Sequence, residues 1–254
     1  MLLALALAVV GTPAAGARAE ADWVVIGFSQ GGVPLVIHRL GGGSTRVLVL
    51  GGQHGGPEAN TIELADSLRS HFLDYPWEIP QGLGLDILVV ANPDGAQLGI
   101  RQFVSGVDPN RNWGTADWQP DAWDSNGQFR PGLGGPRPFS EPETRALRDW
   151  ILATRPALVI NYHSAGGFMF GGRSGLAGEL SEAYANASGY YYPRQGGPRL
   201  LSYRVSGSMN PWLGERGIAG IFVELTNAYD PEVERNLDGV RAVLARLAGA
   251  GAGG

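Results

Sequence analysis

The sequence predicts a single α/β domain with a mixed, mostly parallel, twisted sheet and helices on both of its faces. Short apolar runs rich in Val, Ile and Leu recur along the chain, and each is bounded by Gly, Pro, Asn or Asp. Helical patterns lie between these runs, and no internal repeat or linker divides the chain. The predicted strands lie in WVVIGFS, VPLVIHRL, TRVLVLGG, LDILVVANPDG, PALVINYHS and AGIFVELTN.

The predicted helices follow from apolar spacing and from first-turn signals. After Pro57, one helix face carries Ile62, Ala65, Leu68 and Phe72. A second helix opens at a capping box in residues 140–143 and continues through ETRALRDWILA. A third has Asp230 as its cap and Pro231 in its first turn. The Gly- and Trp-rich residues 113–138 are predicted to form a long surface excursion, which is more often functional than idle.

The composition excludes several classes of protein. Of the 254 residues, 44% are hydrophobic and 17% are charged, which is typical of a globular chain with a sizeable core. The net charge of -5 and the lack of a basic stripe argue against nucleic-acid binding. Because there is no cysteine, disulfides, thiolate metal sites and cysteine nucleophiles are excluded. We expect a monomer.

The first residues indicate an export signal. The apolar residues 2–10 fall short of the about 20 needed to span a bilayer, but they suit the centre of a signal peptide. Ala17-Arg18-Ala19 then offers a cleavage site. No positive charge precedes the apolar run, so a buried first strand or helix is the alternative. We expect residues 1–19 to be a signal peptide, residues 20–254 to fold, and the protein to be exported without a stable membrane anchor.

Polar groups follow four of the predicted strands, where ligands bind in open α/β sheets. His54 and Glu58 follow strand 47–51, and Asn92-Pro93-Asp94-Gly95 follows strand 85–91. His163 lies at the end of strand 157–162, and Glu224 lies at the end of strand 220–223. Two histidines and a carboxylate are the ligand set of a catalytic zinc with an open fourth position. A second carboxylate nearby could then serve as general base.

Each of these residues also has an ordinary structural interpretation. A histidine at a strand end is more often hydrogen-bonded than metal-bound, and we interpret His38 and His71 in that way. Glu58 alone would be a first-turn acid that favours the helix dipole. Glu224 is harder to dismiss, since an unpaired charge is costly to bury in an apolar strand. The glycines around His54 favour a ligand there, because they let the backbone come close to a bound group.

Six motifs in order carry a family resemblance. They are IGFSQGGVPLVIHRLG, GGQHGGPEANT, the pair NPDGAQLGIR and GVDPNRNW, PFSEPETRAL, NYHS and FVEL. Any one of them is weak evidence, but together they span nearly all of residues 20–254. The chain resembles the zinc metallocarboxypeptidases of the funnelin kind, which include digestive carboxypeptidases and bacterial murein peptide amidases. The resemblance implies a zinc carboxypeptidase-like fold and a catalytic domain over residues 20–254.

The resemblance implies a metal site. His54, Glu58 and His163 would bind one Zn²⁺ per chain, and Asp108 would orient His54. The usual first motif of the family is H-x-x-E, whereas here one residue more separates His54 from Glu58. We interpret the extra residue as a longer turn that still brings the carboxylate to the metal. Asn161 stands where many members have Asp, which weakens the expected support of His163.

The resemblance also implies catalytic and substrate-binding roles. Glu224 would be the general base and would later carry the proton to the leaving amine. Arg101 would polarise the scissile carbonyl and stabilise the oxyanion. Asn110 and Arg111 would hold the terminal carboxylate of the substrate, for which arginine offers a planar two-point grip. Tyr203 would be a mobile tyrosine that closes over the substrate.

We expect a zinc metallocarboxypeptidase that hydrolyses the last peptide bond of a peptide with a free C-terminal carboxylate. Three alternatives stay open: a murein peptide amidase that cleaves D-glutamyl-diaminopimelate, a deacylase of N-acyl amino acids, and an inactive peptide-binding protein on the same fold. Residues 206–212 should lie near the pocket for the last side chain. They offer Met209 and no acid, which disfavours Lys or Arg specificity. Arg204 would meet an acidic side chain or the second carboxylate of diaminopimelate.

Overall fold

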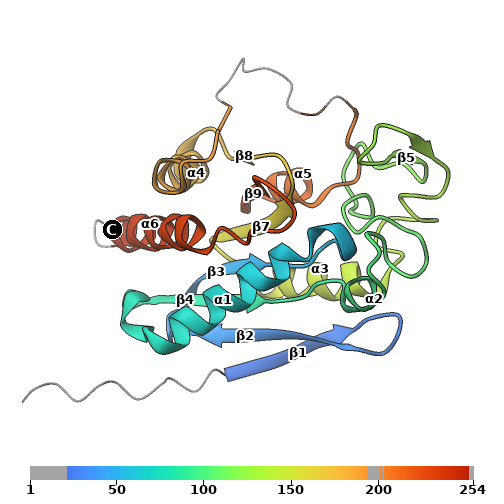
Figure 1. The fold of residues 1–254 in the computed structure, drawn as a ribbon. Coiled ribbons are helices and arrows are strands. Elements are labelled where there is room, and N and C mark those ends of the chain that lie inside the picture. Colours follow the sequence, from blue (N-terminus) through green and yellow to red (C-terminus); the bar gives the residue numbers. More distant parts are fainter. Residues whose placement is uncertain (1–21, 194–200, 202, 252–254) are drawn as a thin grey trace, which may run out of the picture.

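One mixed sheet organises the part of the chain that this computed structural model describes, residues 22–193, 201 and 203–251 (Figure 1). Its strands run in the order β1-β2-β4-β3-β7-β9-β8. The bounds are β1 Asp22–Phe28, β2 Pro34–Leu40, β4 Leu83–Leu88, β3 Thr45–Leu50, β7 Leu158–Ser164, β9 Ala219–Leu225 and β8 Phe168–Gly171. The predicted signal peptide, residues 1–19, lies outside the described residues.

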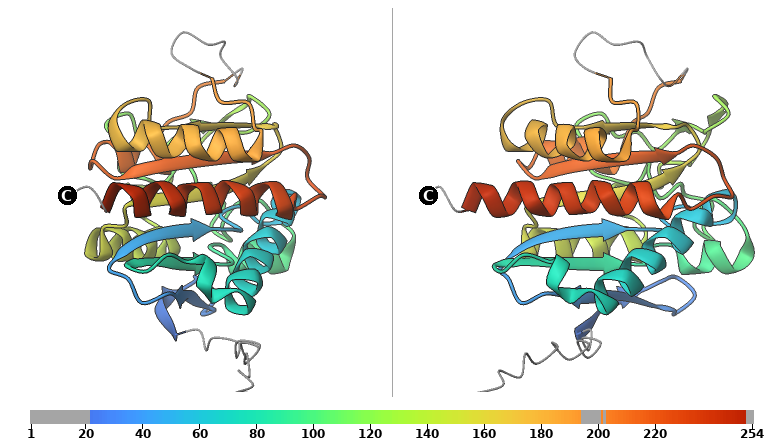
Figure 2. Two further views of the ribbon diagram at one scale, coloured as in Figure 1. Left: turned by 90° about the vertical axis from the view of Figure 1, so that its left-hand side faces the viewer. Right: turned by 60° about the vertical axis from the view of Figure 1, so that its left-hand side comes forward.

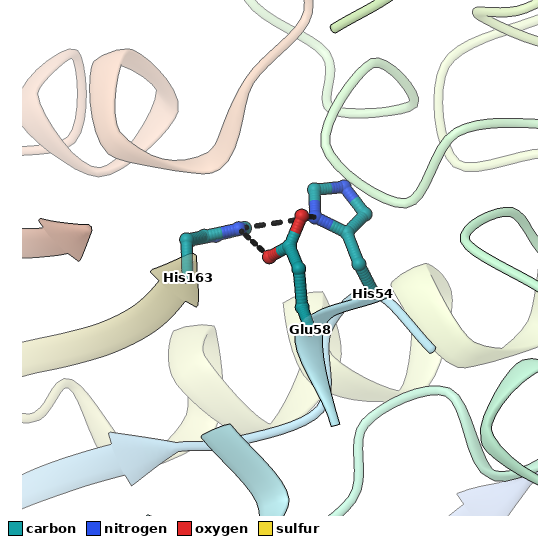
Figure 3. A group of neighbouring side chains, drawn as sticks. All are labelled: His54, Glu58 and His163. Carbon is teal, nitrogen blue, oxygen red and sulfur yellow. Dashed lines mark hydrogen bonds and ion pairs between the residues drawn. The ribbon is translucent and has the colours of Figure 1, made fainter. Parts of the chain in front are cut away.

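The middle of the sheet is parallel and its margins are antiparallel. Strands β4, β3, β7 and β9 pair in parallel, whereas β1, β2 and β8 join them in antiparallel register. The carboxyl ends of the parallel strands meet at one edge, where His54, Glu58 and His163 lie together (Figure 3). The predicted fold class and the predicted strands are confirmed. Strand β8 and the hairpin β5 (Ala122–Trp123) and β6 (Phe129–Arg130) were not predicted, because such short runs carry almost no periodicity.

Helices cover both faces of the sheet (Figure 2). One face carries α1 (Asn60–Asp74), α4 (Gly175–Ser188) and α6 (Val233–Gly251), and the other carries α3 (Pro142–Thr154) and α5 (Met209–Gly214). The short helices η1 (Gly56–Glu58), η2 (Pro76–Glu78) and α2 (Pro93–Leu98) connect these layers. All described helices are too short or too polar to cross a bilayer.

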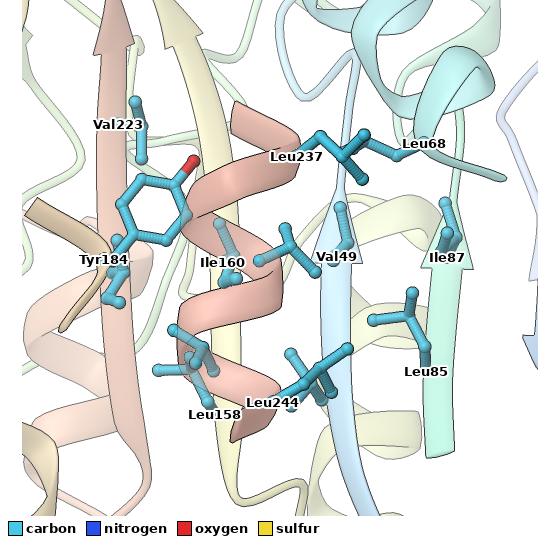
Figure 4. Packing of buried hydrophobic residues seen from close by; sticks show 14 of the residues in the cluster. Val49, Leu68, Leu85, Ile87, Leu158, Ile160, Tyr184, Val223, Leu237 and Leu244 are labelled. Atoms are coloured by element: carbon cyan, nitrogen blue, oxygen red, sulfur yellow. The ribbon is translucent and has the colours of Figure 1, made fainter. Parts of the chain in front are cut away.

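Strand β3 shows why the sequence gives this arrangement. Its alternate side chains are all buried: Val47 and Val49 face the α1, α4 and α6 layer, and Leu48 faces the α3 and α5 layer. A strand buried on both faces is expected in the middle of a parallel sheet. Figure 4 shows Val49 packed in the core that α6 closes with Leu244. Each such buried aliphatic side chain stabilises the fold by about 2 kcal/mol.

Two helix starts differ from the prediction. The prediction of a capping box before α3 is wrong. The Ser140 hydroxyl donates to the Glu141 carboxylate at 2.7 Å and accepts a hydrogen bond from the Asn112 side-chain NH₂ group at 2.9 Å. Glu141 takes the N-cap position without a side-chain hydrogen bond to the helix. Helix α6 begins at Val233, later than predicted, and the Asp230 carboxylate accepts the Glu232 N–H at 2.8 Å before the helix begins.

Glu143, in the first turn of α3, is expected to make stability depend on pH. It is 1% exposed, one carboxylate oxygen accepts the Gln30 N–H at 2.9 Å, and Oε2 has no partner among the described residues. Burial, with Asp94 and Glu141 nearby, raises the pKa of Glu143 above its ordinary value of 4.5. A carboxyl group with a raised folded pKa contributes stability at low pH that is lost as pH rises through that pKa.

The substitution Glu143→Gln removes this titration. The unfolding free energy of the variant relative to wild type should therefore rise as the pH increases above the ordinary glutamate pKa of 4.5. Urea unfolding at several pH values measures the difference. Glu234→Gln is the matched control, since Glu234 is an exposed first-turn acid of α6. A difference that stays flat with pH for Glu143→Gln would count against the buried titration.

Candidate active site

Three side chains from two distant segments converge at the carboxyl edge of the sheet (Figure 3). The Nδ1 atoms of His54 and His163 lie 3.1 Å apart. The Glu58 carboxylate spans both rings, with Oε1 at 2.9 Å from His54 Nδ1 and Oε2 at 3.0 Å from His163 Nδ1. All three residues are buried. Two imidazole nitrogens and a carboxylate aimed at one point form a zinc site with room for a fourth ligand.

The extra residue between His54 and Glu58 is absorbed by the turn η1. The Glu58 N–H donates to Gly55 O at 3.4 Å, and this turn directs the carboxylate back toward His54. A Cβ on Gly55 would lie 2.3 Å from the carbonyl carbon of Gly95, and one on Gly56 would lie 2.4 Å from Gly99 O. Gly55 and Gly56 are therefore needed where the metal loop packs on the backbone of α2 and its C-terminal Gly99.

Asp108 lies behind His54. Its Oδ1 is 3.0 Å from His54 Nε2 and accepts the Asn110 N–H at 2.8 Å, and its Oδ2 is 3.4 Å from Arg101 Nε. Burial alone would raise the pKa of Asp108, but His54 and Arg101 outweigh burial and hold it well below its usual range. An ionised Asp108 accepts the Nε2 proton of His54, which leaves Nδ1 unprotonated and able to bind a metal.

The other two ligands are also in states that suit a metal. Burial lowers the pKa of His163 to about 4, so this imidazole is neutral at pH 7. Burial would raise the pKa of Glu58, but His54 and Arg101 hold it well below its usual range. For His54, burial and Arg101 are outweighed by the carboxylates of Glu58 and Asp108, and its pKa is raised. Metal binding therefore competes with a proton mainly at His54.

The substitution Asp108→Asn is expected to weaken zinc affinity by about 10- to 100-fold, the usual effect of removing the outer partner of a zinc-bound histidine. The amide cannot draw the Nε2 proton as a carboxylate does, so His54 loses basicity and its fixed tautomer. Competition with a chromophoric chelator at pH 7 measures the affinity. Asp66→Asn, at an exposed position of α1, is the control. An affinity for Asp108→Asn within twofold of wild type would contradict this role.

Arg101 and Glu224 flank the three ligands. The Arg101 guanidinium contacts the Glu58 carboxylate and lies 3.1 Å from His54 Nε2. Glu224 lies opposite His163 in the register of β7 and β9. Burial and the nearby Glu58 carboxylate raise the pKa of Glu224 to about 8, against the opposing effect of His54 and Arg101. A dication held by the three ligands would attract the carboxylate form and lower that pKa.

Asn110, Arg111 and Tyr203 line the same cavity as His54, His163 and Glu224, which measures about 200 Å³. The Arg111 guanidinium donates to Trp123 O at 3.1 Å and to Asn110 O at 2.9 Å, which fixes its plane. The Asn110 amide oxygen accepts the Met209 N–H at 3.0 Å, and its NH₂ group has no partner among the described residues. The half-buried Tyr203 ring lies 6.0 Å from the Arg111 guanidinium. Two cationic or amide donors therefore remain available in the cavity.

The remaining histidines are not part of the site. His38 is half-buried in β2, and His71 lies 2.9 Å from the Glu78 carboxylate. Within residues 22–193, 201 and 203–251, the cluster that could hold a metal contains His54, Glu58 and His163. The Asn161 amide donates to Gln53 Oε1 at 2.8 Å and makes no hydrogen bond to His163, so its support of that ligand is indirect.

Apart from Pro211, which belongs to the predicted segment 206–212, the apolar lining of the cavity was not predicted. It consists of Phe170, Leu201, Val205, Pro211 and Phe222. Phe222 also stacks on the His163 ring, with centroids 4.1 Å apart and planes at 18°. One signal for it was available, since Phe222 and Glu224 are two residues apart on one strand and face the same side. No comparable signal marks Phe170, which reaches the cavity through the unpredicted strand β8.

The site and the fold both have known counterparts. The family model described as zinc carboxypeptidase, Peptidase M14, matches residues 23–230. Murein peptide amidase A of Vibrio campbellii is 30% identical over 210 residues, which cover 79% of this chain and 78% of that protein. Murein peptide amidase A of Escherichia coli K12 is 35% identical over 122 residues, 46% of this chain, and the match spans only 48% of that relative.

Solved structures share the fold. The murein-tripeptide amidase of Escherichia coli O157 superposes with a TM-score of 0.68 at 24% identity, over 91% of this chain and 93% of that one. Bovine thrombin-activatable fibrinolysis inhibitor gives a TM-score of 0.74 at 18% identity, over 91% of each chain. The matched family model, the shared fold and the His54–Glu58–His163 zinc site together place this chain in the zinc carboxypeptidase family, Peptidase M14.

Proposed function

We propose that this zinc peptidase is a murein peptide amidase, which hydrolyses the bond between D-glutamate and a C-terminal diaminopimelate. The observation that carries the proposal is one cavity that brings together the ligands His54 and His163, the carboxylate of Glu224, and the carboxylate-binding groups Asn110 and Arg111. Such a cavity fits an amide bond that lies one residue from a free carboxylate. The likeness to murein peptide amidase A of Vibrio campbellii supports the choice of substrate.

In this proposal each residue acts on a stated atom. His54, Glu58 and His163 would hold the zinc ion, which would supply Lewis acidity for the scissile carbonyl and for a water molecule. Glu224 takes a proton from the attacking water and passes it to the nitrogen of the leaving amine. The Arg101 guanidinium donates to the carbonyl oxygen as negative charge develops there. Arg111 and Asn110 bind the terminal carboxylate and set the distance from it to the scissile bond.

The residues that line the cavity affect which C-terminal side chain of a substrate it can accept. Residues 206–212 contribute Ser208, Asn210 and Pro211 to its wall, whereas Met209 is buried away from it. Among the described residues, Glu224 is the one carboxylate that lines the cavity, which disfavours a terminal Lys or Arg. Arg204 lines a second cavity together with Asp121, and it is not among the residues that line the active-site cavity. A side chain that reached there would find both charges that match the far end of diaminopimelate.

A second candidate is a carboxypeptidase that acts on ordinary peptides, which was the first expectation from the sequence. The apolar wall of Phe170, Leu201 and Phe222 favours it, because it would suit a terminal aromatic or aliphatic residue. Both candidates use the same catalytic groups. A purely peptide-binding role is less favoured, since it needs no carboxylate at the position of Glu224.

Hydrolysis of three substrates separates the candidates. The zinc-loaded protein is incubated with a diaminopimelate-containing murein tripeptide, a blocked dipeptide with a C-terminal aromatic residue, and one with C-terminal Arg. We expect release of diaminopimelate, with kcat/KM at least about 100-fold above either dipeptide, or about 3 kcal/mol of discrimination. Faster cleavage of the aromatic dipeptide would replace the amidase with the carboxypeptidase. No cleavage of any substrate by zinc-loaded protein would reject both.

We also propose that the protein acts outside the cytoplasm, where murein is found. The proposal depends on the apolar run and the cleavage site in residues 1–19. N-terminal sequencing of protein recovered from the periplasm or the medium should find Glu20 as the first residue. Protein confined to the cytoplasm with an uncut N-terminus would refute it.

A further inference from the structure

The side chain of Asn60 joins three segments that meet around the metal site. Its Oδ1 accepts the Ser164 hydroxyl at 2.8 Å. Its Nδ2 donates to Asn227 O at 2.8 Å and to Asp230 O at 3.0 Å. Asn60 is 4% exposed, so these three bonds are made with little competition from water. The bond from Asn60 to Asp230 joins residues that are 170 positions apart in the sequence.

Each of the three segments carries a group of the active site. Asn60 is two residues beyond the ligand Glu58, and Ser164 directly follows the ligand His163. Residues 227–230 belong to the connection that leaves β9 just after Glu224. Figure 1 shows the start of α1 beside the connection between β9 and α6. The Ser164 N–H also lies 3.3 Å from Glu58 Oε2, so the Asn60 bond reinforces a contact between the ligand segments.

An ordinary explanation for this asparagine does not fit. Asn at a helix start usually caps the helix by accepting a backbone N–H. Here Ala59 is the N-cap, and α1 has no side-chain cap. The hydrogen bonds of the Asn60 side-chain amide go to Ser164, Asn227 and Asp230, which lie in other segments. The connection after β9 is already folded by Asn227 Oδ1, which accepts the N–H groups of Tyr229 and Asp230 at 3.0 and 2.7 Å. Asn60 therefore ties a preformed turn to the metal loop.

We propose that Asn60 is a positioning residue that fixes the spacing between the two zinc-ligand segments and the strand end that bears Glu224. It acts through Ser164 on His163 and through the 227–230 turn on β9, and it touches neither metal nor substrate. Ligands that are held in place before the metal binds lose less conformational freedom on binding. The hydrogen bonds of Asn60 therefore raise zinc affinity. A base held at a fixed distance from the reacting water raises kcat more than it lowers KM.

Zinc affinity is the first test, and it does not depend on which peptide is the substrate. We expect Asn60→Ala to bind Zn²⁺ about 10-fold more weakly in competition with a chromophoric chelator, and Ser164→Ala about threefold more weakly. The double variant should bind like Asn60→Ala alone, since both changes break one hydrogen bond at Ser164. Ser164→Ala removes only a hydroxyl group, so it keeps the test valid if Asn60→Ala does not fold.

The control is Asn236→Ala. Asn236 is 0% exposed and bonds Tyr184 and Tyr190, which hold no ligand, so this variant should lose stability but keep wild-type zinc affinity. With saturating zinc, Asn60→Ala should lower kcat about 10-fold and change KM less than about threefold. Zinc affinity unchanged in both Asn60→Ala and Ser164→Ala, or reduced as much in Asn236→Ala, would overturn the proposal. Failure of all variants and wild type to cleave peptide would reject the proposed function while the zinc data still decide this one.

Discussion

Replacing Glu224 with glutamine is expected to reduce amide hydrolysis at least about a thousandfold while leaving zinc bound. Glutamine keeps the shape of the side chain and cannot accept a proton from water. Glu224 is separate from the ligand set of His54, Glu58 and His163, so the metal should stay. The substitution should not destabilise the metal-free protein. Burial disfavours the charged form of Glu224, as its raised pKa shows, and glutamine is uncharged.

Turnover of the murein tripeptide and zinc content are measured on the same samples. Glu63→Gln, an exposed acid of α1, is the control and should match wild type in both. Glu58→Gln is the complementary variant, and it should lose zinc and activity together because it removes a ligand. If Glu224→Gln kept more than a tenth of wild-type kcat with zinc bound, the proton would have to be carried by another group, and the assigned mechanism would fail.

The second large effect is expected far from the site, at the buried ion pair of Arg46 and Asp86. Arg46 is 7% exposed and Asp86 is 1% exposed. The Arg46 Nε donates to Asp86 Oδ1 at 2.7 Å, and its NH₂ groups reach four carbonyl oxygens: those of Leu40, Gly41, Gly43 and Leu85. Removing the carboxylate leaves a buried guanidinium without its counter-charge. Asp86→Ala should therefore lower the unfolding free energy by about 3–5 kcal/mol.

Urea unfolding of zinc-free protein measures this loss without a contribution from the metal. Asp66→Ala is the matched control, since Asp66 pairs with Arg69 at 2.7 Å on an exposed surface where such pairs are worth at most about 1 kcal/mol. The double change Arg46→Met with Asp86→Leu should recover most of the loss, because it removes both charges. A cost below about 1 kcal/mol for Asp86→Ala would show that water reaches the pair.

Local signals account for what could be predicted from the sequence. A continuous apolar run predicts strand β3, and the apolar spacing after Pro57 predicts helix α1. His54 and Glu58 are close in sequence, and one turn brings them together. His163 needed only the rule that parallel strands end at the same edge of a sheet. The residues that carry the metal were therefore accessible to sequence reasoning.

Signals fail where a side chain has several partners to choose from. Ser140 has the sequence of a helix cap, but Asn112 and Glu141 take its hydrogen bonds. Within residues 203–206, Tyr203 and Val205 line the active-site cavity, whereas Arg204 and Ser206 line the neighbouring one. The sequence gave no reason to expect that Arg204 lines the second cavity and not the active-site cavity.

By itself the sequence determined the α/β class and the central strands through local patterns, and it indicated the three metal ligands and their chemistry through the positions of strand ends together with the resemblance to the zinc metallocarboxypeptidases. Only the tertiary structure decided which side chains line the cavity, and that Asn60 joins three active-site segments. Both features depend on contacts between residues that are distant in the sequence, 170 positions apart for Asn60 and Asp230, and no local pattern records which distant group will be the partner.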